Sequence, residues 1–88
     1  MKIQVVNGKL AEILQKDLAL AEYAVKQLKE EVVPFEKKYS MKWNIFIKKF
    51  EGGKLGDDRK WFKWYALSQF ILDWNDTKSE IKTALPSS

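Results

Sequence analysis

The chain has 88 residues and a formal net charge of +4, and 45% of its residues are hydrophobic. This length allows one domain at most, and the hydrophobic content is too high for a disordered chain. Cysteine and histidine are both absent, which excludes disulfides, thiolate metal sites and a histidine general base. No apolar run is long enough to cross a bilayer or to form a signal peptide, so we expect a cytoplasmic protein without a membrane partner.

The positive charge is concentrated in residues 35–65, which carry nine Lys or Arg and four Asp or Glu, a net charge of +5. The rest of the chain carries seven basic and eight acidic residues, a net charge of −1. Residues 35–74 also hold eleven of the twelve aromatic residues. This combination fits either an anionic partner or an aromatic core that lysines keep in solution.

The first long helix is expected over about residues 9–38. Residues 1–8 are expected to be flexible or to form a short strand, because residues 3–6 are rich in β-branched side chains. Pro34 should either end the helix near residue 32 or bend it there and let it continue to Tyr39. The apolar positions recur at alternating spacings of four and three, which is a heptad seam that can pack against another helix. The seam consists of Leu14, Leu18, Ala21, Val25, Leu28, Val32 and Phe35.

Two further helices are expected. The short one covers about residues 41–51, with Ser40 as its N-cap and Gly52-Gly53 as its stop. The second long helix covers about residues 58–85, and Asp57 or Asp58 caps it. It carries a second heptad seam, which consists of Trp64, Leu67, Ile71, Trp74, Lys78, Ile81 and Leu85.

The two matching seams predict a single all-α domain. We expect an antiparallel helical hairpin of two long helices, with the short aromatic helix between them covering one end. A hairpin of this kind leaves outer apolar positions uncovered, so we expect dimerisation or a partner protein to complete the core. The uncovered positions are expected to be Ile13, Leu20, Trp61, Tyr65 and Phe70.

The sequence offers no catalytic constellation, since its serines have no histidine partner. Helix capping accounts for Asp57 and Asp58, and solvation accounts for Asp73 and Asp76, so we expect no metal site. The glycines of the central turn lack the spacing of a phosphate-binding loop. We therefore predict a non-enzymatic protein that has no catalytic residue and no cofactor.

Lysines and arginines alternate with aromatic residues through the central segment. Aromatic rings can stack on unpaired bases while the cations neutralise phosphates, which makes a small basic nucleic-acid-binding protein one alternative. Aromatic residues at helical spacing also commonly form a core, and their basic neighbours then face solvent. The candidate nucleic-acid-binding residues are Lys48, Lys49, Lys54, Arg59, Lys60 and Lys63.

Three motifs carry a family resemblance: FEKKYSM at residues 35–41, EGGKLGDD at 51–58 and WFKWYAL at 61–67. They resemble a group of short archaeal and bacterial helical proteins, many of which look like the antitoxins of type II toxin–antitoxin pairs. The resemblance spans about residues 30–75. It implies a non-enzymatic protein that binds and neutralises a cognate small toxin, for example a ribonuclease, encoded by an adjacent gene.

The sequence departs from that group around the turn, where the group is acidic and this chain has Arg59, Lys60, Lys63 and Tyr65. An acidic surface that mimics RNA is therefore absent here, which leaves room for an acidic partner or DNA. The lead hypothesis is an antitoxin-like protein-interaction module that also forms a homo-oligomer. A self-associating structural hairpin is a further alternative. Large apolar side chains usually dominate such interfaces, and the predicted partner-binding residues are Trp61, Trp64, Tyr65 and Phe70.

Overall fold

The computed structural model describes residues 8–85. This part of the chain forms three α-helices and one 3-10 turn, and it contains no strand, which confirms the all-helical class. The expected short strand lies outside the described residues. The elements are α1 (Gly8–Tyr39), α2 (Trp43–Glu51), η1 (Arg59–Trp61) and α3 (Phe62–Ala84).

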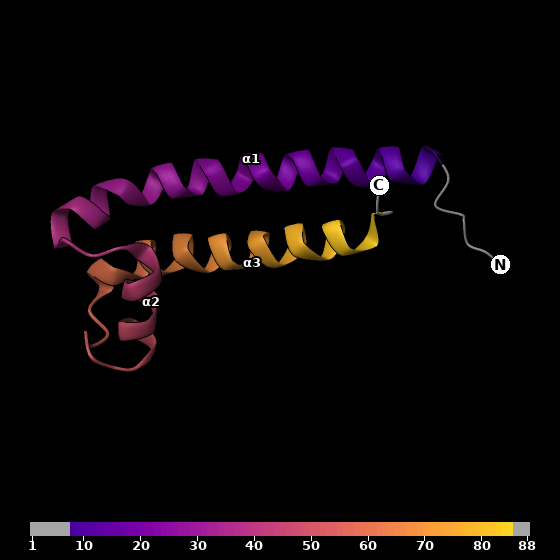
Figure 1. Cartoon of the computed structure of the whole chain (residues 1–88). Coiled ribbons are helices and arrows are strands. Elements are labelled where there is room, and N and C mark those ends of the chain that lie inside the picture. The colour runs from indigo at the N-terminus through magenta and orange to yellow at the C-terminus, as the bar shows by residue number, and fades with distance from the viewer. Residues whose placement is uncertain (1–7, 86–88) are drawn as a thin grey trace.

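The two long helices lie side by side and run in opposite directions, and α2 lies beside one end of the pair (Figure 1). We call residues 35–65, where α2 and η1 pack on the ends of α1 and α3, the head. We call the remaining two-helix part the shaft. The molecule measures 53 × 22 × 20 Å, and its radius of gyration is 17.1 Å. A compact domain of this length would have a radius of gyration of about 12 Å, so the shaft leaves much of both helices uncovered.

Helix α1 continues through Pro34 and ends at Tyr39, which is the second of the two outcomes expected for this proline. Ser40 follows with a φ angle of 53°, in the left-handed region, and the Met41 amide donates to the Glu36 carbonyl oxygen over 3.1 Å. A left-handed residue with such a bond is a common way to end a helix. The prediction that Ser40 caps α2 is therefore wrong, because Ser40 instead ends α1.

A side chain from α1 stabilises the start of α2. The N-cap residue, Lys42, offers no side-chain hydrogen bond to the helix. The Glu36 carboxylate accepts a hydrogen bond of 2.8 Å from the Trp43 amide. Glu36 thus satisfies an amide that would lack a partner inside the helix, and it fixes where α2 starts relative to α1.

The central turn forms as the glycines predict. Helix α2 ends at Glu51, and Gly53 adopts a φ angle of 77° that glycine accommodates without strain. Asp58 caps the next element through a 3.0 Å hydrogen bond from the Lys60 amide, but that element is η1 and not α3. Helix α3 consequently begins at Phe62 rather than at about residue 58.

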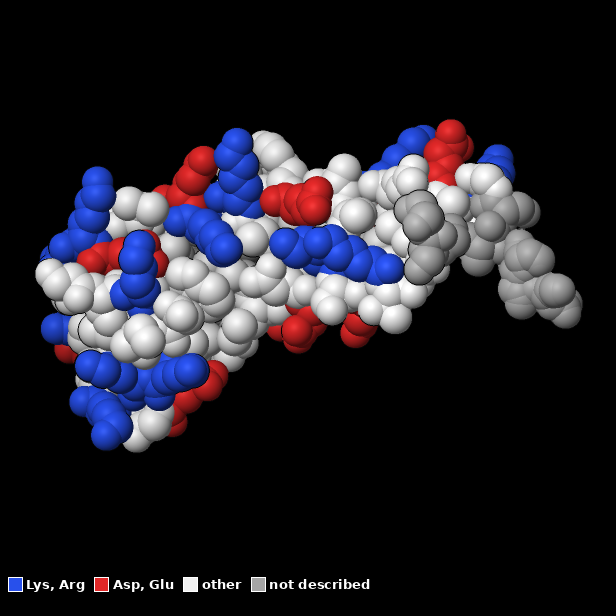
Figure 2. All heavy atoms as spheres, viewed as in Figure 1, with Lys and Arg blue, Asp and Glu red and all other residues white. Residues whose placement is uncertain are grey.

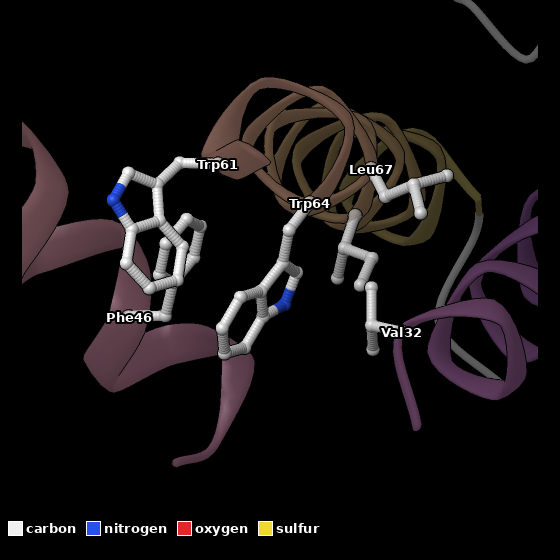
Figure 3. Close-up of a cluster of buried hydrophobic side chains, with 6 residues drawn as sticks. Val32, Phe46, Trp61, Trp64 and Leu67 are labelled. Atoms are coloured by element: carbon white, nitrogen blue, oxygen red, sulfur yellow. The ribbon is translucent and has the colours of Figure 1, made fainter. Parts of the chain in front are cut away.

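The core lies where the head meets the shaft, and it is a cluster of aromatic and aliphatic side chains contributed by all three helices and η1 (Figure 3). Trp64 stacks on Phe46 with ring centroids 3.8 Å apart and planes 3° from parallel. Trp64 Nε1 and Ser68 Oγ are buried without a hydrogen-bond partner among the described residues. Ring packing rather than polar contacts therefore holds this core together. The cluster consists of Val32, Phe46, Trp61, Trp64, Leu67 and Ile71.

Candidate functional site

Two of the four predicted partner-binding residues lie inside the core. Trp61 is 7% exposed and Trp64 is fully buried. The 3-10 turn directs Trp61 toward Tyr39, whose ring centroid is 4.7 Å away, and the indole Nε1 of Trp61 donates to the Leu55 carbonyl oxygen over 3.1 Å. The expectation that Trp61 is an uncovered outer position is wrong. Both tryptophans stabilise the head and leave almost no surface for a partner.

Tyr65, the third predicted residue, is half-buried and connects α3 to α2. Its hydroxyl donates to a Glu51 carboxylate oxygen over 2.9 Å and accepts from Gln69 Nε2 over 2.7 Å. Gln69 Nε2 also donates to the same Glu51 oxygen over 3.1 Å. The ring packs against Phe50 at a centroid distance of 4.7 Å. Through these contacts Tyr65 links α3 to α2, and its side chain remains partly exposed.

Phe70 is the predicted residue that the fold presents to solvent, since 52% of its surface is exposed. It lies beside Trp74 on α3, above a groove between the two long helices. The groove has a volume of about 350 Å³ and is lined by Ala24, Gln27, Leu28, Glu31, Phe70 and Trp74.

Further exposed apolar side chains lie in the N-terminal half of α1. Leu20 is 56% exposed and Ile13 is 46% exposed, as the sequence predicts for both. Ile13 lies seven residues before Leu20, and Leu20 lies four residues before Ala24, which places all three on the same flank of the helix. We call the resulting surface the shaft face, and it consists of Ile13, Leu20, Ala24, Leu28, Phe70 and Trp74. Exposed apolar side chains of both long helices gather on this flank, with Gln27 and Glu31 at the groove and Asp17 between Ile13 and Leu20. Such a concentration of exposed apolar side chains marks a candidate interaction site.

The six candidate nucleic-acid-binding residues are all exposed, and all belong to the head. Lys48 and Lys49 lie in the last turn of α2, Lys54 lies in the turn, and Arg59 and Lys60 belong to η1. Lys63 lies in the first turn of α3. Basic side chains predominate over acidic ones at this end of the molecule in the view of Figure 2.

The aromatic residues between these cations point inward. Phe46, Trp61 and Trp64 are buried, and Phe50 is half-buried against the same cluster. They cannot stack on bases without unfolding the head. The exception is Phe62, which is exposed at the start of α3. The head is therefore a basic surface with few accessible rings.

Within residues 8–85, no three acidic side chains converge where they could hold a metal ion. The helices of this part also lack the length and hydropathy needed to span a membrane. No family model matches the chain, and neither a curated protein nor a solved structure matches it. The candidate surfaces are thus the shaft face and the basic head.

Proposed function

We propose that this chain is a non-enzymatic protein-interaction module that binds and neutralises a cognate small toxin in the manner of an antitoxin. The resemblance of the central motifs to antitoxin-like proteins suggests the class of partner. The observation that carries the proposal is the shaft face, an uncovered apolar surface formed jointly by α1 and α3.

A helix of the partner protein is the element that we expect to pack on the shaft face. Two packed helices bury one stripe each, whereas a third or fourth helix is needed to enclose a bundle core. Phe70 and Trp74 form the aromatic part of the groove, and Ala24 opposite them leaves room for an incoming side chain. Aromatic anchors beside such a groove usually supply most of the binding energy of a protein interface. Phe70 therefore replaces Trp61 and Trp64 as the expected anchor.

The test is co-expression of the tagged chain with each product of the immediately adjacent genes, followed by affinity capture and mass analysis. We expect one small neighbouring protein to be retained in a fixed ratio. Phe70→Ser should weaken its capture by more than about tenfold, because truncating a central anchor costs about 2 kcal/mol or more.

Leu72→Ser is the matched control. Leu72 is also exposed, and two residues along a helix rotate a side chain by about 200°, so it lies away from the shaft face. Its substitution should leave capture intact, and far-ultraviolet circular dichroism should show equal helicity in both variants. Failure to retain any neighbour, or equal loss in the two variants, would remove the support for this function.

A further inference from the structure

We infer that the head is a second, independent binding surface, which takes the phosphate backbone of duplex nucleic acid without reading its bases. This site is separate from the shaft face and does not depend on the proposed partner protein. The ligand offers a regular and rigid array of phosphates. Several cations on a folded surface can bind such an array at the same time.

The charge of the described residues is divided between the two parts of the molecule. The head carries nine Lys or Arg against four Asp or Glu, a net charge of +5. Residues 8–34 and 66–85 carry six basic and eight acidic residues, a net charge of −2. In the view of Figure 2, basic side chains predominate over the head, whereas basic and acidic side chains both lie along the shaft. A polyanion is thus attracted to one end of the molecule and repelled by the other.

Three of the four acidic side chains of the head accept hydrogen bonds where its elements meet or begin. Glu36 accepts from the Trp43 amide at the start of α2, and Asp58 accepts from the Lys60 amide at the start of η1. Glu51 accepts from both Tyr65 and Gln69. These carboxylates hold the elements of the head together, whereas the six candidate cations are solvent-exposed. The cations are therefore available to phosphates without disrupting the fold.

The six candidate cations also lie on ordered backbone. Helix α2 and η1 carry four of the six, and the hydrogen bond from Trp61 Nε1 to the Leu55 carbonyl oxygen fastens the turn that carries Lys54. Lys60 Nζ lies 4.9 Å from the centroid of the Trp61 ring. A surface whose backbone is already ordered loses less entropy on binding than a flexible basic tail.

Burial of the aromatic residues decides which nucleic acid fits. Single-stranded binding depends largely on bases stacking on several accessible rings. Phe46, Trp61 and Trp64 are in the core, and Phe62 is the one ring of the described head that is more than half exposed. Contacts confined to phosphates carry no sequence information. We therefore expect preference for a duplex over its separate strand, and no preference between sequences.

The experiment measures the fluorescence anisotropy of a labelled duplex DNA of about 24 base pairs, its separate strand, and a duplex RNA of the same sequence. Association constants are measured from about 50 to about 200 mM salt, the range over which counterion release is easily seen. We expect dissociation constants on the order of 10⁻⁶ to 10⁻⁴ M and a steep fall in affinity with salt. Tighter binding to one of the duplexes identifies which of them is the ligand.

Two matched triple variants locate the site. The head variant is Lys48→Gln, Lys54→Gln and Lys63→Gln, and the shaft variant is Lys16→Gln, Lys26→Gln and Lys82→Gln. All six lysines are exposed, and each variant lowers the formal net charge from +4 to +1. The head variant should lose at least about tenfold in affinity and about two to three units of salt slope, because each lost phosphate contact removes about 0.9. The shaft variant should keep the wild-type slope.

Several results would overturn the inference. Equal losses in the two variants would mean that net charge alone is responsible, and absent or salt-insensitive binding would mean that there is no phosphate site. Stronger binding to the single strand would contradict the burial argument. Tighter binding to polyglutamate than to either duplex would assign the head to an acidic polypeptide instead. Capture of the partner protein through the shaft face should be unchanged in the head variant, so the two proposals fail independently.

Discussion

At the scale of single residues, Trp64 holds the head together. Its indole is fully buried and is flanked by Phe46 at 3.8 Å, Phe35 at 5.7 Å and Tyr39 at 5.8 Å between ring centroids. It thus joins α1, α2 and α3 in a single stack. Phe70 lies six residues later on α3, and about half of its surface is exposed to solvent. The two residues belong to the same helix but have opposite structural roles.

We predict that Trp64→Ala unfolds the head, whereas Phe70→Ala does not. Truncation of a buried tryptophan costs about 3 to 5 kcal/mol, which is a large share of the stability of a domain this small. Phe70→Ala should change the free energy of unfolding of the monomer by no more than about 1 kcal/mol. Thermal unfolding followed by circular dichroism measures both variants. Equal destabilisation would mean that Phe70 is part of the folding core and not an available anchor.

At the scale of the elements, α2 depends on contacts that come from its neighbours. It has nine residues, which is too short for a stable isolated helix. Phe46 and Ile47 bury its apolar side, and the Glu36 carboxylate satisfies the Trp43 amide. The position of α2 is therefore fixed by α1 and α3 rather than by its own helix propensity.

We expect Glu36→Ala to destabilise the protein by about 1 kcal/mol, the usual effect of removing a cap from a helix N-terminus. Glu30→Ala is a suitable control, because Glu30 is an exposed residue of the same helix with no capping role. Urea denaturation monitored by tryptophan fluorescence measures the difference, since the indoles of the head report on its packing. Indistinguishable midpoints for the two variants would show that α2 does not need this cap.

At the scale of the whole molecule, the elongated shape is the feature that requires an explanation. The radius of gyration of 17.1 Å exceeds the roughly 12 Å of a compact chain of equal length, because half of the hairpin has two helices and no third layer. A small domain with so much uncovered apolar surface gains stability from any chain that packs on it. In the absence of a partner protein, we expect a second copy of this chain to pack there.

We therefore predict that the isolated protein forms a dimer through the shaft face. Two hairpins packed face to face complete a four-helix bundle, with Leu20 and Phe70 near its centre. Sedimentation equilibrium should show dimers, and the double variant Leu20→Ser and Phe70→Ser should be monomeric with unchanged helicity. A wild-type monomer at every concentration tested would contradict this prediction, as would a double variant that still dimerises.

Much of the fold follows from the sequence alone. Alternating spacings of four and three predict both long helices, and the seams they form contain the buried residues Val25, Val32, Trp64 and Ile71. Gly52 and Gly53 predict the end of α2, because few other residues accept the left-handed backbone that Gly53 adopts. The exposure of Ile13 and Leu20 also follows, because both lie beside the seam rather than on it. Local periodicity and local backbone preference determine all of these features.

The tertiary structure determines which apolar side chains are buried and which residue caps α2, and local sequence patterns do not determine these features. Trp61, Tyr65 and Phe70 all lie outside the seam of α3, yet η1 turns Trp61 inward, Glu51 and Gln69 engage Tyr65, and Phe70 is left exposed. The cap of α2 comes from Glu36, seven residues before Trp43, which no periodic signal indicates. These outcomes depend on the path of the chain through the turn, which places side chains from separate helices together. A sequence pattern fixes which face of a helix is apolar, but only the packed neighbours determine which part of that face remains open to a partner.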